Sequence, residues 1–101
     1  MSTPKWKRQI EAKAERQIGK LSPKDRARVL RSIAELEQAD NPLSIGDVEY
    51  FKGSKNPRIF KRRVWPYRLF FYVESDLIIE ADVQYKGLLI ITGVYYQHEG
   101  Y

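Results

Sequence analysis

The chain has 101 residues, of which 43% are hydrophobic and 31% charged, and it contains no cysteine. This length and composition predict one small globular domain over residues 1–101, and they exclude a disulfide scaffold or a cysteine-based zinc site. Its 18 basic and 13 acidic side chains give a net charge of +5. This excess favours an acidic partner, either nucleic acid or a tightly bound acidic protein. No stretch has the pattern of a signal peptide or a membrane span, so we expect a cytoplasmic protein without membrane contact.

The first 40 residues predict two helices. Apolar residues recur every four positions near the start, at Trp6, Ile10, Ala14 and Ile18. This spacing predicts an amphipathic helix over residues 5–19. Ser22, Pro23 and Asp25 supply an N-cap, a first-turn proline and a first-turn carboxylate, so we expect a second helix that runs to about Gln38. The short link between them predicts an antiparallel helical hairpin.

The remainder of the chain predicts a β-sheet. Runs of apolar, β-branched and aromatic residues are separated by turn-forming residues, which predicts strands over residues 48–52, 58–65, 67–73, 77–85 and 88–96. The order of these elements predicts an α+β fold. In this fold the N-terminal helical hairpin packs on one face of a four- to five-stranded antiparallel β-sheet.

The excess positive charge is concentrated in one stretch, from Lys52 to Arg68. This stretch has seven basic side chains and no acidic one, whereas the rest of the chain has 11 basic against 13 acidic. Aromatic residues lie among these charges. Such a surface suits a single-stranded polyanion, because cations bind phosphates and aromatic rings stack on bases. A run of charge is more often only a solvated surface, but the absence of carboxylates favours RNA binding, here by Lys52, Lys55, Arg58 and Arg62.

Strand alternation separates the charged side chains into two groups. Phe60 and Val64 must face the helices if they belong to the core, and Arg62 then points the same way. We therefore expect Arg62 to have a carboxylate partner or to lie at a sheet edge, because a buried unpaired charge is too costly. Lys61 and Arg63 point to the opposite, open face, and Arg68 of the next strand joins them there.

Three short motifs carry a resemblance to a known family. They are L-S-P-x-x-R at residues 21–26, F-K-G at residues 51–53 and R-V-x-x-Y-R at residues 63–68. In this order and spacing the chain resembles the RelE/ParE toxin superfamily over roughly residues 10–86. The resemblance implies helices on one face of a twisted antiparallel sheet and an active groove on the other. It also implies an antitoxin partner, usually an acidic disordered segment that folds around the toxin.

The resemblance also implies catalytic residues. RelE-type members cleave mRNA in the ribosomal A site without a metal or cofactor, by attack of a ribose 2′-OH on the adjacent phosphate. Arg63 and Arg68 match the two arginines of the family's strand pair, and Lys61 matches a position that is often basic. Since arginine stays protonated, Arg63 and Arg68 are expected to stabilise the charge that develops on the phosphate.

The family's last catalytic elements, a histidine or basic pair and a late tyrosine, fit this chain in two registers. Tyr85 and Lys86 match by their distance from Arg68 and need no insertion, so we prefer them. If residues 77–85 are an insertion, the terminal elements are instead Gln97, His98 and Tyr101. Both registers lack the family's usual arginine.

The leading hypothesis is the toxin of a type II toxin–antitoxin system that acts as a ribosome-dependent mRNA endoribonuclease. Its expected partners are an antitoxin, mRNA and the ribosome, and a homodimer is left open. One alternative is a ParE-like toxin that binds DNA gyrase without nuclease activity, and another is a nucleic-acid-binding module without catalysis. The resemblance also leads one to expect an initial β-strand, whereas residues 1–10 here predict a helix or an irregular arm.

Overall fold

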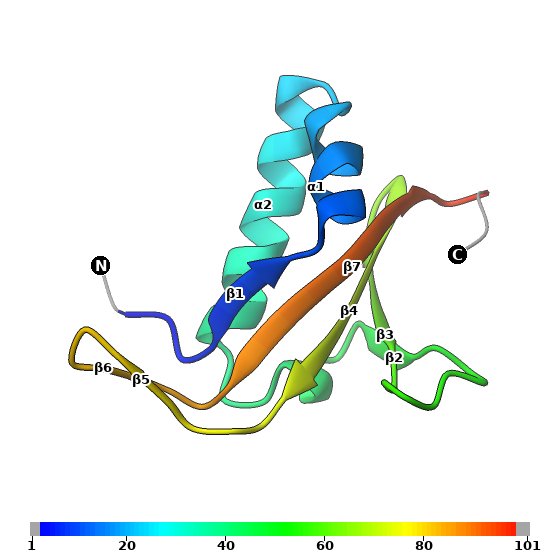
Figure 1. Cartoon of the computed structure of the whole chain (residues 1–101). Helices are drawn as coiled ribbons and strands as arrows, with labels where there is room; N and C mark the ends of the chain where they lie inside the picture. The colour runs from blue at the N-terminus through cyan, green and yellow to red at the C-terminus, as the bar shows by residue number, and fades with distance from the viewer. Residues whose placement is uncertain (1–2, 99–101) are drawn as a thin grey trace.

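The computed structural model describes residues 3–98, which form a five-stranded sheet with two helices on one face and a small separate hairpin at one end (Figure 1). The strand order in the sheet is β1-β7-β4-β3-β2. The strands are β1 (Lys7–Ile10), β2 (Val48–Tyr50), β3 (Phe60–Val64), β4 (Tyr67–Glu74) and β7 (Leu88–Tyr96). The α+β prediction is confirmed, although β1 runs parallel to β7 and makes the sheet mixed.

The two helices are α1 (Ala12–Gly19) and α2 (Pro23–Gln38), and a single 3₁₀ turn follows at Pro42–Ser44. The start of α2 is set by the predicted cap, because the Ser22 hydroxyl accepts a hydrogen bond of 3.2 Å from the backbone N–H of Asp25. Neither helix is long and apolar enough to cross a membrane.

The helix predicted over residues 5–19 is wrong in its first half, where the chain forms β1. The four-residue spacing of Trp6 and Ile10 also fits a strand, since residues 6, 8 and 10 share one strand face. Trp6, directly before β1, and Ile10, at its end, both pack in the core, and the Arg8 side chain between them pairs with Glu37 of α2. Pairing with β7 therefore overrides the helical pattern, and the first strand that the family resemblance implies is present.

The single strand predicted over residues 77–85 is also wrong. The chain there forms two short strands, β5 (Ile78–Glu80) and β6 (Val83–Tyr85), which pair with each other outside the main sheet. They are joined at Ala81 and Asp82, whose φ angles of 50° and 65° lie in the left-handed region. Apolar and polar residues keep alternating through this turn, so the sequence pattern gives no sign of it.

The main core lies between the helices and the sheet. It contains fully buried side chains from both layers, including Ile33 and Leu36 of α2 and Leu69 and Phe71 of β4. A second, smaller cluster lies on the opposite face of the sheet, where Ile59, Phe70 and Tyr95 are buried together. The loop between β2 and β3 supplies part of this second cluster and covers the open face near that loop. The part of the open face near the β3–β4 turn is left for a site.

Candidate functional site

The candidate site is built on the β3–β4 hairpin. The two strands are joined by the two-residue turn Trp65-Pro66, and this turn sets a register in which Arg63 lies directly opposite Arg68. Directly opposed residues point to the same face of a sheet, with their Cβ atoms about 5 Å apart. The hairpin register alone therefore brings the two arginines together on the open face.

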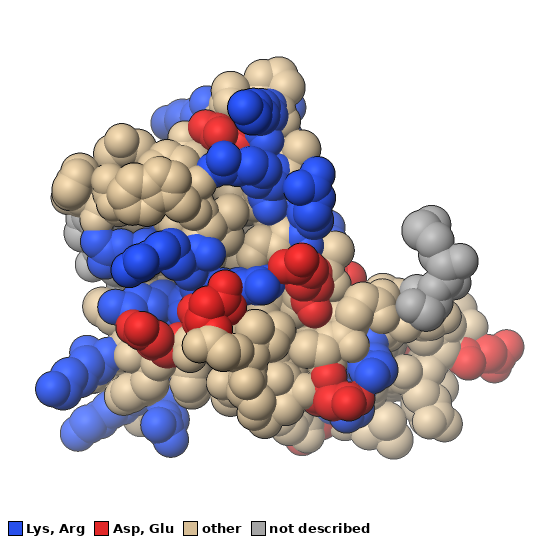
Figure 2. Space-filling model, turned by 180° about the vertical axis from the view of Figure 1, so that it is seen from behind, with Lys and Arg blue, Asp and Glu red and all other residues tan. Residues whose placement is uncertain are grey.

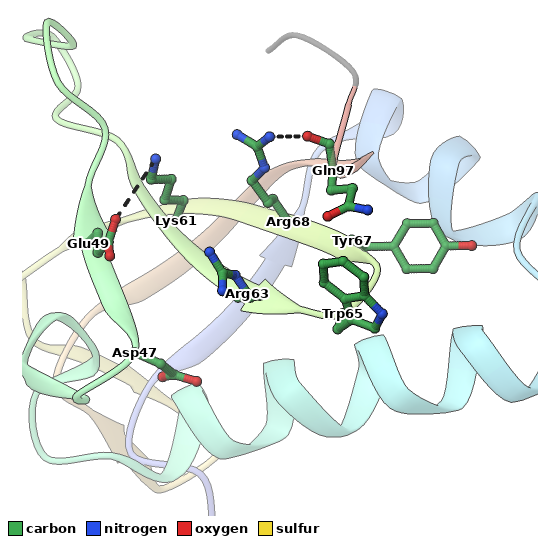
Figure 3. A pocket seen from close by; sticks show the side chains of 8 residues that line it. All are labelled: Asp47, Glu49, Lys61, Arg63, Trp65, Tyr67, Arg68 and Gln97. Carbon is green, nitrogen blue, oxygen red and sulfur yellow. Dashed lines mark hydrogen bonds and ion pairs between the residues drawn. The ribbon is translucent and has the colours of Figure 1, made fainter.

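Both arginines line one pocket of about 410 Å³. Figure 3 shows their side chains and that of Lys61 directed to the same side of the hairpin. Strand β2 and the end of β7 form the walls. The lining residues are Asp47, Glu49, Lys61, Arg63, Trp65, Tyr67, Arg68 and Gln97. The open face thus holds a concave site whose floor is cationic.

The three cations of the pocket differ in their partners. The Lys61 ammonium lies 3.9 Å from a carboxylate oxygen of Glu49, its cross-strand neighbour. The Arg68 guanidinium donates to the backbone carbonyl of Gln97, which is uncharged (Figure 3). Within residues 3–98, the side chain of Arg63 forms neither an ion pair nor a hydrogen bond, and it is exposed. Among the described residues, the pocket therefore presents two guanidinium groups that form no ion pair with a carboxylate.

The tip of the hairpin is fixed against α2. The Tyr67 hydroxyl donates a hydrogen bond of 2.9 Å to Asp25, and the guanidinium of Arg28 donates to the carbonyl of Trp65. The hydrogen bond to the Asp25 carboxylate raises the pKa of Tyr67 above its ordinary value of 10.0, with smaller contributions from burial and from the charge of Asp25. On the other side, the N–H of Gln97 donates to the carbonyl of Pro66 at 2.9 Å.

Arg62, predicted to bind RNA, is placed on the other side of the sheet. Its guanidinium lies 2.9 Å from Glu35 and 3.1 Å from Asp47, and it also donates to the carbonyl of Ser32. The expectation of a carboxylate partner is thus confirmed twice over. Two carboxylates balance its charge and leave little attraction for a phosphate.

The other predicted RNA-binding residues, Lys52, Lys55 and Arg58, lie outside the pocket. All three are exposed on the loop between β2 and β3, beyond Lys61 along the same hairpin. The Arg58 guanidinium stacks 4.6 Å from the centre of the Tyr50 ring. Figure 2 shows basic side chains projecting at the lower left, where this loop lies. The loop is a basic extension of the site rather than part of its floor.

The structure does not bring Tyr85 and Lys86 to the pocket. Tyr85 ends β6, and Lys86 lies beyond it at the end of the sheet away from the β3–β4 turn. The Lys86 ammonium donates to the carbonyl of Asp40 at 3.1 Å, and its backbone N–H donates to Lys5. Because residues 78–85 form a hairpin outside the sheet, the register that treats them as an insertion agrees better with this arrangement.

The terminal elements of that second register lie in different places. Gln97 follows β7 directly and lines the pocket. His98 is exposed, and its ring centre is 6.0 Å from that of Tyr96. Tyr101 lies outside the described residues. Of the predicted terminal residues that the structure describes, Gln97 alone contributes to the pocket lining.

Four lining residues were not proposed for the site from the sequence: Asp47, Glu49, Trp65 and Tyr67. Glu49 lies opposite Lys61 in the β2–β3 pairing, and this register brings it to the pocket. Asp47 lies directly before β2 and lines the pocket beside that strand. Trp65 lies on the tight turn, and a large aromatic residue at the exposed tip of a hairpin is the signal by which it was identifiable. Within residues 3–98 no group of three or more acidic, histidine or cysteine side chains could hold a metal ion.

Comparison of the sequence with protein families and with curated proteins finds no match. Comparison of the structure with solved structures does. The archaeal RelE-RelB complex from Pyrococcus horikoshii contains a chain with a TM-score of 0.66 and 14% identity, which covers 95% of this chain and 99% of its own length. The RelBE2 toxin-antitoxin complex from Mycobacterium tuberculosis gives a TM-score of 0.53 and 19% identity, covering 93% and 99%. This chain therefore has the RelE-like fold over nearly its whole length.

Proposed function

We propose that this chain is the toxin of a type II toxin–antitoxin system and cleaves mRNA on the ribosome. The observation that carries the proposal is the directly opposed pair Arg63 and Arg68 in one pocket. Like charges directly opposite each other destabilise a sheet. A fold that keeps such a pair beside a cavity is explained if an anion binds between the two guanidinium groups. A phosphate accepts two or more hydrogen bonds from such groups.

The reaction that fits this site is transfer of a phosphodiester to the neighbouring 2′-oxygen. The 2′-oxygen attacks phosphorus, the bond from phosphorus to the 5′-oxygen breaks, and the products are a 2′,3′-cyclic phosphate and a 5′-hydroxyl. Negative charge grows on the non-bridging oxygens in the transition state. Arg63 and Arg68 are suited to stabilise it, since neither forms an ion pair with a carboxylate of the described residues.

Two proton transfers complete the reaction, and Glu49 and Lys61 are suited to them. The 2′-OH must lose a proton, and Glu49 is a carboxylate of the pocket lining able to accept it. The leaving 5′-oxygen must gain a proton, and the Lys61 ammonium is a donor on the same wall, 3.9 Å from Glu49. We assign the base to Glu49 and the acid to Lys61 because, in their ion pair, Glu49 is deprotonated and Lys61 is protonated.

The partner chemistry follows from the structural neighbours and from the charge. The neighbours were solved as a RelE-RelB complex and as the toxin-antitoxin complex RelBE2. We propose that this chain likewise binds an antitoxin in the cytoplasm. Its net charge of +5 favours an acidic segment as that partner.

A second candidate function is inhibition of DNA gyrase without RNA cleavage. The observation that favours it is the composition of the pocket, whose lining contains no histidine in the part of the chain that the structure describes. His98 lies outside the pocket and packs near Tyr96. A toxin that binds gyrase without cleaving RNA does not need a histidine as catalytic acid or base.

The deciding experiment adds the purified protein to a cell-free translation extract. The expected result is cleavage of mRNA within its translated region, with naked mRNA left intact in the same buffer. Products are mapped by primer extension, and the 5′-hydroxyl end is checked by phosphorylation. Intact mRNA together with normal protein synthesis would contradict the proposal. Intact mRNA together with loss of gyrase supercoiling would support the second candidate.

A further inference from the structure

Trp65 presents an apolar surface in a place where the fold does not need one. Its side chain is 60% exposed, although a tryptophan normally buries most of its ring. It occupies the first position of the β3–β4 turn and lines the pocket beside Arg63 and Arg68 (Figure 3). The other tryptophan of the chain, Trp6, is 5% exposed, packs in the core and donates its indole N–H to the carbonyl of Ala39.

The backbone that carries this indole is held in place. The carbonyl of Trp65 accepts from Arg28, the carbonyl of Pro66 accepts from Gln97, and Tyr67 donates to Asp25. Three successive residues are thus tied to α2 and to the end of β7. A ring on such a support loses little freedom when it binds a flat partner, which raises the affinity that the contact can supply.

The surroundings of the indole indicate what kind of partner it binds. Apart from Tyr67, the other residues of the pocket lining are charged or polar, so a purely apolar side chain of a partner protein would find few apolar contacts there. A nucleotide has both a flat ring and a phosphate. Its base can stack on the indole while its phosphate reaches the arginines that flank the turn.

We propose that Trp65 is a stacking platform for a nucleobase next to the phosphate that Arg63 and Arg68 hold. The proposal rests on the proposed function in one respect, the identity of the polyanion as single-stranded RNA. It adds that the pocket binds a base as well as a phosphate, and that the β3–β4 turn supplies this contact. In this role Trp65 positions the substrate strand and takes no part in proton transfer.

The two tryptophans of the chain allow a direct test by fluorescence. The probe is a hexaribonucleotide with 2′-O-methyl groups, which cannot undergo 2′-OH attack. The matched ligand is an abasic ribose-phosphate hexamer of the same charge. In the wild type, the hexaribonucleotide should quench the emission in a saturable way and the abasic hexamer should not. In Trp65→Phe only buried Trp6 remains, and its emission should be unaffected by either ligand.

Binding constants of the variants separate stacking from charge. Trp65→Ala should weaken binding of the hexaribonucleotide by about 5- to 150-fold, which corresponds to the loss of one stacked base. Trp65→Phe, which keeps a ring, should lose less. Neither variant should change the affinity for the abasic hexamer or the slope of log K against log salt, because no phosphate contact is removed. Since the side chain is exposed, all three proteins should have the same thermal unfolding midpoint.

The outcomes distinguish this inference from the proposed function. Equal affinity of the wild type and Trp65→Ala for the hexaribonucleotide, or no quenching of the wild type, overturns the stacking role. This holds even if mRNA is cleaved in a translation extract, and Trp65 is then an anchor for a protein partner. Saturable quenching that needs the bases supports the inference. It does so even if the extract shows intact mRNA, a result that counts against the nuclease alone.

Discussion

Basic side chains gather at two ends of the sheet, and the two groups differ in how their charge is balanced. Beside the β5–β6 hairpin, Lys5 lies 2.6 Å from Asp40, Lys86 lies 3.7 Å from the same carboxylate, and Lys7 pairs with Glu80. At the β3–β4 turn, Arg63 forms no ion pair with any described residue, and Arg68 bonds to a backbone carbonyl.

Figure 2 shows acidic and basic side chains side by side at the right, near the β5–β6 end. A nine-residue strand such as β7 spans roughly 30 Å, so the two groups are separate sites. The number of basic residues therefore does not locate an anion site. An anion site is found where basic residues lack ion-pair partners.

The largest expected effect comes from removing both unneutralised cations. Arg63→Ala combined with Arg68→Ala should lower mRNA cleavage by about 10⁴-fold, because loss of one such charge-stabilising group commonly costs 10²- to 10³-fold. The fold should persist, since both side chains lie on the open face and their removal relieves a like-charge pair. Cleavage is measured in the translation extract and folding by circular dichroism with a thermal scan.

The matched control removes two cations at the other end. Lys5→Ala combined with Lys86→Ala changes the net charge by the same amount, yet cleavage should stay within about 2-fold, because those side chains are paired with Asp40. Equal loss of activity in both double variants would mean that overall charge matters and the pocket does not. This control also tests the register that assigns catalysis to Lys86.

Glu49 should give the next largest effect. If it accepts the proton of the 2′-OH, Glu49→Gln should lower the rate of cleavage at saturating substrate by about 100-fold. RNA binding should be unchanged or tighter, because a negative charge leaves a cationic pocket. Single-turnover cleavage and equilibrium binding are measured on the same preparation. A normal rate with altered binding would reduce Glu49 to a partner of Lys61.

Much of this site was predictable from local pattern. Alternation placed Lys61, Arg63 and Arg68 on one face and Arg62 on the other, and the structure agrees because a two-residue turn preserves that alternation. The fold class, the helical hairpin and the start of α2 followed from short-range signals of the same kind. Where neighbours in sequence decide the geometry, the sequence was sufficient.

The misses share one physical cause, which is pairing between distant segments. Residues 7–10 are a strand only because β7, some 80 residues later, offers an edge to pair with. The β5–β6 hairpin at residues 78–85 leaves the sheet at the point where β4 ends and β7 begins. There the backbones of Glu74 and Gly87 lie so close that a Cβ on Gly87 would be 1.9 Å from the carbonyl oxygen of Glu74. Because the β5–β6 hairpin lies outside the sheet, Gln97 lines the pocket and Lys86 does not.

A smaller effect is expected when the balanced end is unbalanced. Asp40→Asn leaves Lys5 and Lys86 without their shared carboxylate, so it should create a second weak anion site. Binding to single-stranded RNA should gain a few-fold in affinity at low salt, with a salt slope steeper by about 0.7 for each phosphate newly contacted. Cleavage should not increase, because Arg63 and Arg68 lie in the pocket at the other end of the sheet. A rise in cleavage that parallels binding would contradict the separation of the two ends.

The same carboxylate gives a pH test. The hydrogen bond from Lys5, then its charge and that of Lys86, lower the pKa of Asp40 below the ordinary 3.8. A lowered folded-state pKa contributes stability that is present above the ordinary value and is lost as pH falls through the folded value. The difference in unfolding midpoint between the wild type and Asp40→Asn should therefore hold from pH 6 to about 4 and disappear below it. A difference that stays constant from pH 6 down to the lowest pH at which the protein is folded would contradict an ionic origin of these contacts.

The smallest expected effect concerns the support of the hairpin tip. The hydrogen bond to Asp25 raises the pKa of Tyr67, so the neutral phenol is the form that stabilises the turn. That contribution is complete below the ordinary value near 10 and is lost as pH rises through the folded-state value. By NMR of ¹³C-labelled tyrosine, the titration midpoint of Tyr67 should lie above 10, and Asp25→Asn should lower it towards 10. Asp25 forms no hydrogen bond or ion pair with Arg63 or Arg68, so in Asp25→Asn cleavage at pH 7 should fall only because Trp65 is held less firmly. If the titration midpoint of Tyr67 does not shift in this variant, the tip is held by Arg28 and Gln97 alone.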